Sequence, residues 1–194
     1  MVDAKAISLD RMVSAVERVR QRLIKACEAL DRAGIQYAVA GGNAVAAWVS
    51  TVDEAAVRNT RDVDVMIERN DLASVRKALE NVGFVYRHVG SLDVFLESPK
   101  GSVRDAVYII FAGELVREGE PMPNPGLDAS QSTGRFRVLD LRSLVQIKLT
   151  AFRDKDRTHL RDLIDVGLVD ASWIGGLSPA LASRLKGILD TPEG

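Results

Sequence analysis

Cysteine is nearly absent from this chain of 194 residues, which contains only Cys27. A single cysteine cannot form an internal disulfide, and its scarcity fits a reducing compartment. Aromatic residues make up 5% of the chain and are too scattered to form a base-stacking platform for nucleic acid. The formal net charge is −1, which excludes a global electrostatic attraction to nucleic acid or to an anionic membrane.

Long apolar runs are also missing. No segment approaches the roughly 20 consecutive apolar residues that span a bilayer, and the first residues lack the basic and apolar regions of a secretory signal. We therefore expect a cytoplasmic protein with no membrane partner. His88 and His159 have no cysteine or histidine partner at zinc-ligand spacing. The chain has no nucleophile elbow, dinucleotide fingerprint or P-loop, because Gly41-Gly42-Asn43 is not followed by the P-loop lysine and serine.

The remaining composition is that of an ordinary globular protein, with 46% apolar and 27% charged residues. Three- and four-residue spacing of apolar side chains predicts helices, and short apolar runs predict strands. The expected helices cover 8–33, 43–49, 72–81 and 141–152, a segment after the charged stretch 153–157, and 179–189. The expected strands are 35–40, 62–68, 84–88, 92–97, 106–111 and 135–139. This order predicts a mixed α/β part followed by a smaller helical part.

The division of the chain follows its proline content. Residues 121–134 contain Pro121, Pro123 and Pro125 and are expected to form an exposed loop. We therefore divide the chain into a core with an N-terminal helix (1–120), this proline-rich loop, and a C-terminal strand with a helical extension (135–194).

Two aspartates interrupt the apolar run at 62–68. Asp62 and Asp64 share one face of the expected strand, because side chains alternate along a strand. Two neighbouring carboxylates repel each other. A divalent cation between them removes that cost, and oxygen ligands suit Mg²⁺. The pair therefore predicts a metal-dependent site for phosphoryl or nucleotidyl transfer.

A glycine pair precedes these aspartates by about twenty residues, at the turn from strand 35–40 into the next helix. Gly41 and Gly42 lack Cβ atoms, so backbone N–H groups can approach a triphosphate there, helped by the N-terminus of the helix. The same pair also suits an ordinary tight turn.

The arrangement of strand, Gly-Gly, helix and Asp-x-Asp resembles the DNA polymerase β-like nucleotidyltransferase superfamily. Within it, Arg58-x-Thr60-x-Asp62-x-Asp64 and the later Lys148-Leu-Thr-Ala-Phe-Arg and Arg161-Asp-Leu-Ile-Asp resemble the branch near the AbiEii-type toxins. The resemblance covers roughly residues 35–165. It implies a mixed β-sheet flanked by helices with a C-terminal helical extension, an NTP substrate such as ATP, and Mg²⁺ or Mn²⁺ bound by Asp62 and Asp64.

The resemblance also implies roles for the residues around the pair. Gly41, Gly42 and Asn43 would cradle phosphates. Thr60 could orient Asp62 by a hydrogen bond or simply begin the strand. Arg58 could pair with Asp62, contact a phosphate or lie on the surface. Lys148 could neutralise phosphate charge from the edge of its helix or extend into solvent.

The third metal ligand of such enzymes has no clear counterpart in this chain. The position that aligns with the usual acid is Tyr108, and a neutral phenol is a poor ligand for Mg²⁺. Asp93 on the preceding strand is favoured over Asp105 as a substitute, because Asp105 faces the opposite side of a regular strand. The remaining interpretation is that neither acid binds metal.

Three functions therefore remain open. The first is Mg²⁺-dependent transfer of a nucleoside monophosphate from an NTP to an unknown acceptor, which could be RNA, protein or a small molecule. The second is a catalytically impaired protein of this fold that binds nucleotide or a macromolecular partner, as in a toxin–antitoxin pair. The third is an oligomer whose acidic strand is merely solvated. A protein partner or a homo-oligomer is compatible with each of them.

Overall fold

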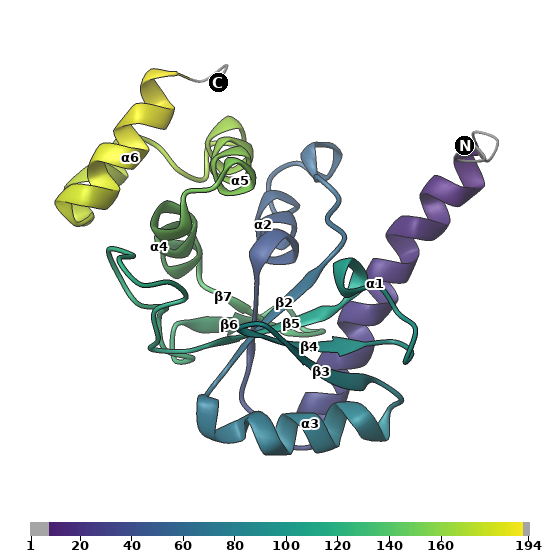
Figure 1. The fold of residues 1–194 in the computed structure, drawn as a ribbon. Coiled ribbons are helices and arrows are strands. Elements are labelled where there is room, and N and C mark those ends of the chain that lie inside the picture. The colour runs from purple at the N-terminus through teal and green to yellow at the C-terminus, as the bar shows by residue number, and fades with distance from the viewer. Residues whose placement is uncertain (1–7, 192–194) are drawn as a thin grey trace, which may run out of the picture.

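The computed structural model describes residues 8–191, which form one seven-stranded mixed sheet with helices on both faces (Figure 1). The strands lie in the order β3-β4-β5-β2-β1-β7-β6. They are β1 (Ala38–Ala40), β2 (Val63–Ile67), β3 (Val85–Val89), β4 (Leu92–Leu96), β5 (Val107–Phe111), β6 (Ser130–Ser132) and β7 (Arg137–Leu139). The helices are α1 (Leu9–Arg32), α2 (Gly41–Val49), α3 (Leu72–Asn81), α4 (Leu141–Ala151), α5 (Asp154–Asp165) and α6 (Pro179–Asp190). The expected mixed α/β fold is confirmed.

The strands that carry the glycine pair and the acid pair are neighbours at the centre of the sheet. β1 runs antiparallel to β2, with Ala40 opposite Asp64. β2 runs parallel to β5, with Asp64 opposite Tyr108. The chain leaves β1 directly into α2, so the N-terminus of α2 lies beside β2.

Alternation along β2 sends its side chains to two separate cores. Val63, Val65 and Ile67 pack with residues of α1 and α3 on one face, and Met66 packs with residues of α2, α4, α5 and α6 on the other. Figure 1 shows these two groups of helices on opposite sides of the sheet. Asp64 has the parity of Met66, so the acid pair faces α2, α4 and α5.

The helix starts show how far local signals determine these elements. Asp140 caps α4, since its side chain accepts a hydrogen bond from the Ser143 backbone at 2.7 Å. Asp71 precedes α3 but makes no such bond. The reason is that a 3₁₀ turn, Arg69–Asp71, runs straight into α3, and a capping residue needs an extended backbone.

The proline-rich segment 121–134 differs from the expected exposed loop. It contains β6, which pairs antiparallel with β7 at the edge of the sheet. Its sequence Ser-Gln-Ser lacks the branched apolar residues that signal a strand. Asn124 is buried, and its amide donates a hydrogen bond to the carbonyl of Phe111 at 2.9 Å. The proposed three-part division of the chain stays a prediction. Over residues 8–191, no helix has the length and apolar character needed to cross a membrane.

Candidate active site

Asp62 and Asp64 lie on the same face, at the start of β2. The Thr60 hydroxyl donates a hydrogen bond of 2.8 Å to Asp62 Oδ1, which is the orienting contact expected for Thr60. Burial alone would raise the pKa of Asp62, but this bond and the charge of Lys155 hold it below its ordinary value. The pKa of Asp64 is raised, first by burial and then by the charge of Asp62. The two carboxylates thus repel each other, and the pKa of Asp64 shows the effect.

The glycine pair makes room for this acid pair. Gly41 has φ = +63°, and a Cβ atom on it would lie 1.7 Å from Asp64 Oδ2. A Cβ atom on Gly42 would lie 2.9 Å from both Cβ and Oγ1 of Thr60. No side chain fits at either position, so the first turn of α2 approaches the carboxylates as closely as a backbone can.

Asn43 and Arg58 have other contacts than those expected. The Asn43 amide donates a hydrogen bond to the Asp62 carbonyl at 2.8 Å, so this side chain fastens α2 to the start of β2. Arg58 does not pair with Asp62. Its Nε and one terminal nitrogen donate to the two carboxylate oxygens of Asp162 at 3.0 and 2.9 Å, because the segment before β2 lies against α5.

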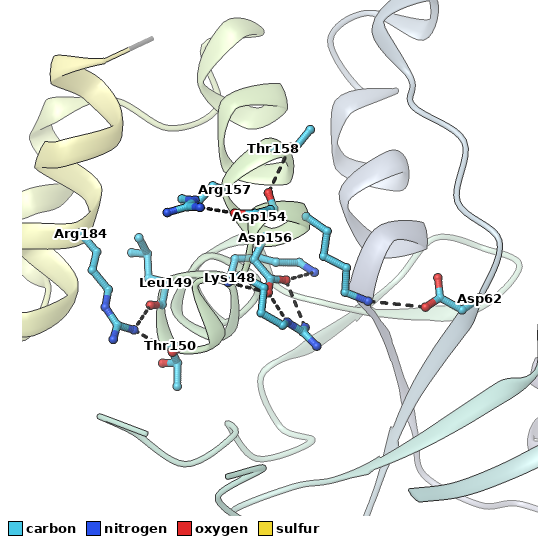
Figure 2. Close-up of polar contacts among 11 residues, drawn as sticks. Asp62, Lys148, Leu149, Thr150, Asp154, Asp156, Arg157, Thr158 and Arg184 are labelled. Atoms are coloured by element: carbon cyan, nitrogen blue, oxygen red, sulfur yellow. Dashed lines mark hydrogen bonds and ion pairs between the residues drawn. The ribbon is translucent and has the colours of Figure 1, made fainter. Parts of the chain in front are cut away.

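A network of charged side chains from α4 and α5 lies beside the acid pair (Figure 2). Asp156 is fully buried. It accepts hydrogen bonds from Lys148 Nζ at 3.2 Å and Arg153 Nε at 2.6 Å. Lys155 Nζ lies 3.6 Å from Asp62 Oδ2, which connects α5 to β2. Three cations therefore accompany the three carboxylates of Asp62, Asp64 and Asp156.

Lys148 occupies a different position from the one expected at the edge of its helix. Its side chain is 3% exposed, and burial lowers its pKa although Asp156 and Asp64 both act to raise it. Its ammonium is bound by the buried carboxylate of Asp156 and is not exposed to solvent. Lys155, in contrast, has a side chain that is 50% exposed and an ammonium that contacts the acid pair at Asp62.

The sequence interpretation did not assign Arg153, Lys155 or Asp156 to the site. The charged stretch 153–157 contained them, but alternating charges usually mark a solvated helix surface. The available signal was Asp156 at the third position of α5, where its carboxylate also accepts a hydrogen bond from the Arg153 backbone at 3.3 Å. Such an acid fastens the beginning of a helix, and here it fastens the one beside the acid pair.

The expected third ligand, Asp93, does not reach the acid pair. It lies opposite Ile109 in β5, one position away from Tyr108, and therefore on the other face of the sheet. Its carboxylate accepts a hydrogen bond from the Tyr86 hydroxyl at 2.5 Å and lies 2.9 Å from His88 Nδ1. Asp93 and Asp64 therefore lie on opposite faces of the sheet, and the expected assignment of Asp93 to the metal site is corrected.

Tyr108 stands where the alignment placed it, beside Asp64, and donates a hydrogen bond to the Val103 carbonyl at 2.8 Å. Its pKa is raised by burial and by the charges of Asp62, Asp64 and Asp105. Asp105 itself pairs with Arg61 at 3.0 Å. Among the residues described, no group of three or more His, Cys, Asp or Glu side chains is placed to hold a metal ion.

Comparisons with known proteins agree with this geometry. Residues 22–117 match the family model of the aminoglycoside-2''-adenylyltransferases. The solution structure of the antibiotic-resistance factor ANT(2'')-Ia is similar, with a TM-score of 0.52 and 10% identity over 93% of this chain and 92% of that one. An antigenic nucleotidyltransferase-like protein from Paracoccidioides brasiliensis gives a TM-score of 0.55 and 16% identity over 92% and 91% of the two chains. No curated protein sequence matches the chain.

The chain therefore has a nucleotidyltransferase fold. The match to the aminoglycoside-2''-adenylyltransferase family model covers just under half of the chain and includes the glycine pair, the acid pair and Tyr108. The narrower resemblance to AbiEii-type toxins stays a prediction.

Proposed function

We propose that the protein transfers a nucleoside monophosphate from an NTP to an acceptor, using Mg²⁺ or Mn²⁺ bound by Asp62 and Asp64. The observation that supports this most is the meeting of Gly41 with Asp64, where the absence of a side chain brings the first turn of α2 against the carboxylate. This meeting places backbone N–H donors, which bind phosphate at helix N-termini, beside oxygen ligands for a hard cation.

The donor set fits a divalent cation. The two carboxylates lie on one face and interact unfavourably, since Asp62 acts to raise the pKa of Asp64. Lys155 Nζ lies 3.6 Å from Asp62 Oδ2, which indicates that this position favours positive charge. When bound, the cation would bind phosphate oxygens and activate the attacking acceptor oxygen.

The side chains of this protein would bind and orient the substrate. Backbone N–H groups of Gly41 and Gly42 would donate to phosphate oxygens. Lys155 and Arg153, both partly exposed, would neutralise phosphate charge once Lys155 leaves Asp62. Thr60 and Asn43 would hold the side chain and backbone of Asp62 in place. Lys148 would not contact the substrate. Its charge would help to keep Asp156 ionised.

The names of similar proteins suggest which substrates to try first. An adenylyltransferase family model points to ATP as the donor and an aminoglycoside as a small-molecule acceptor. RNA and protein hydroxyls remain the other acceptor classes, as the toxin resemblance implies.

A second candidate function is favoured by Tyr108. A phenol at the place of the third acid, with Asp93 on the other face, supports a protein that binds an NTP or a macromolecular partner without transferring the nucleotide. Because metal catalysis depends on complete coordination, two carboxylates could hold a metal–nucleotide complex and still catalyse poorly.

The two functions are separated by incubating the protein with Mg²⁺ and α-labelled NTPs against an aminoglycoside, tRNA, total protein and itself. Transfer by the wild type that disappears in Asp62→Asn and Asp64→Asn, but not in Asp93→Asn, supports the enzyme. Transfer that survives in both variants of the pair would sink the proposed site. NTP binding without transfer, with transfer gained in Tyr108→Asp, supports the binding protein.

A further inference from the structure

The apolar repeat of helix α1 extends beyond the part of the helix that packs against the core. Apolar residues recur in strict alternation of three and four positions, which is the spacing of a two-stranded helical coil. They are Leu9, Met12, Val16, Val19, Leu23, Ala26 and Leu30. The last three are buried against the sheet, whereas Leu9, Met12 and Val16 are 72%, 64% and 41% exposed.

The exposed half of α1 begins where the sheet ends. Arg22 is buried and binds both Glu97 and the carbonyl of Arg61, one residue before Asp62. The N-terminal half of α1 extends past the sheet (Figure 1). Val19 still packs against the core at its edge, whereas Leu9, Met12 and Val16 are exposed. The segment 9–19 thus presents an apolar seam to one side, beyond the end of the sheet at which β2 begins.

We propose that this seam pairs with the same seam of a second copy of the chain, with the two α1 helices antiparallel. When Met12 lies opposite Val16 of the other copy, the twofold axis passes beside Ser14 and Leu9 falls opposite Val19. Leu9, Met12 and Val16 then each meet an apolar position. The partner of Leu9 is Val19, which is partly buried because it also packs against the core of its own chain.

The charges beside the seam favour the same arrangement. In this register the exposed Asp10 of one copy lies two positions along from Arg20 of the other, on the same side of the seam, and the symmetry produces this pair twice. Within residues 8–191, the guanidinium of Arg20 pairs with Glu17 at 3.0 Å, and its side chain is 53% exposed. It therefore has room to bind a second carboxylate.

The burial of Leu23 makes the parallel alternative less favourable. A parallel pair would continue from Val19 to Leu23, and Leu23 is already buried under the sheet. An antiparallel pair needs only the segment 9–19 and places the two sheets at opposite ends of the paired helices. Eleven residues from each helix make a contact at the small end of specific interfaces, so we expect a dimer that dissociates in the micromolar range.

The test is the molar mass of the full chain by sedimentation equilibrium from roughly 1 to 500 μM, a range that brackets micromolar dissociation. The wild type is expected to dimerise. Met12→Glu/Val16→Glu is expected to stay monomeric with unchanged circular dichroism and thermal unfolding, because both positions are exposed. Leu115→Glu, at a residue 52% exposed elsewhere, is the matched control and should dimerise normally. A wild-type monomer throughout, or a dimer that persists in the double variant, would overturn the proposal.

Cysteine crosslinking tests the direction of the helices. Mixing a Met12→Cys chain with a Val16→Cys chain should give the mixed disulfide under mild oxidation faster than either chain crosslinks with itself. The wild type should not crosslink, since Cys27 is buried. Preferential formation of the Met12→Cys homodimer would contradict the antiparallel arrangement.

Discussion

Gly41 is the residue at which backbone conformation and site chemistry meet. Its φ of +63° is costly for any side chain, and its Cβ would overlap Asp64 Oδ2. Gly34 has almost the same φ, +65°, but an added Cβ would have nothing within 4 Å. A side chain at Gly34 would therefore have only the conformational cost. A side chain at Gly41 would have the same cost and would also displace the Asp64 carboxylate.

Gly34→Ala is expected to lower the free energy of unfolding by about 1–2 kcal/mol, the cost of a left-handed backbone with a side chain. Gly41→Ala should lower it by about 1–3 kcal/mol more, because steric overlap adds to that cost, and should also weaken binding of Mg²⁺–ATP. Urea denaturation and calorimetry of the two variants measure both effects. Equal losses in the two variants would show that Gly41 does not support Asp64.

The sequence predicted individual residues where the reasoning was local. Thr60 orients Asp62 because parity and a two-residue spacing suffice for that contact. The partner of Arg58 could not be predicted, since Asp162 lies 104 positions away. Asp93 was misplaced because parity within one strand does not determine which face it shares with another strand. That relation depends on the register between the two strands.

At the scale of elements, α5 is the one that joins the helical part of the chain to the acid pair. It supplies Asp156 to the buried ammonium of Lys148, Lys155 to Asp62, and Asp162 to Arg58. Its N-terminal half was hidden in a charged stretch in the sequence. The long amphipathic helices were predicted within a few residues, whereas β6 was missed because three polar residues form a strand only through pairing with β7.

Asp156→Asn is expected to lower the free energy of unfolding by about 3–5 kcal/mol, because it removes the carboxylate to which the buried Lys148 ammonium is hydrogen-bonded. Asp190→Asn provides the control. It breaks the exposed Lys186–Asp190 pair, whose side chains are 65% and 61% exposed, and should cost at most about 1 kcal/mol. Chemical denaturation compares the two. Recovery of stability in Lys148→Met/Asp156→Leu would confirm the unpaired charge as the cause, and a small effect of Asp156→Asn would contradict it.

At the scale of the whole molecule, stability should depend on His159. Its Nδ1 is buried without a hydrogen-bond partner in the described part of the chain. Burial, followed by the charge of Lys148, lowers the pKa of His159 to about 4. An exposed imidazole has a pKa of about 6.5, so the unfolded chain takes up a proton between about pH 6.5 and 4 that the folded chain does not.

The free energy of unfolding should therefore fall as the pH decreases through this window, by up to about 1.4 kcal/mol per pH unit from this group. His159→Gln removes the titrating group and should flatten this part of the profile. Urea denaturation of both proteins between pH 7 and pH 4 checks the sign. Identical slopes for the wild type and the variant would exclude His159 as the source.

The fold as a whole was predicted from the order of elements and the Gly-Gly and Asp-x-Asp pattern, and the comparisons agree with it. The arrangement of the two helical layers was not predictable in the same way. It depends on which face each helix covers, and that follows from long-range packing. The proposed function rests on the same whole-molecule property, because β1, β2, α2 and α5 must meet for the acid pair to face cations and backbone donors.

The binding of ATP, measured by titration calorimetry with and without Mg²⁺, tests this account most directly. The wild type and Asp93→Asn should bind ATP only when Mg²⁺ is present, and Asp62→Asn/Asp64→Asn should lose that binding while remaining folded. Mg²⁺-dependent binding of equal strength in the variant of the acid pair would contradict the account.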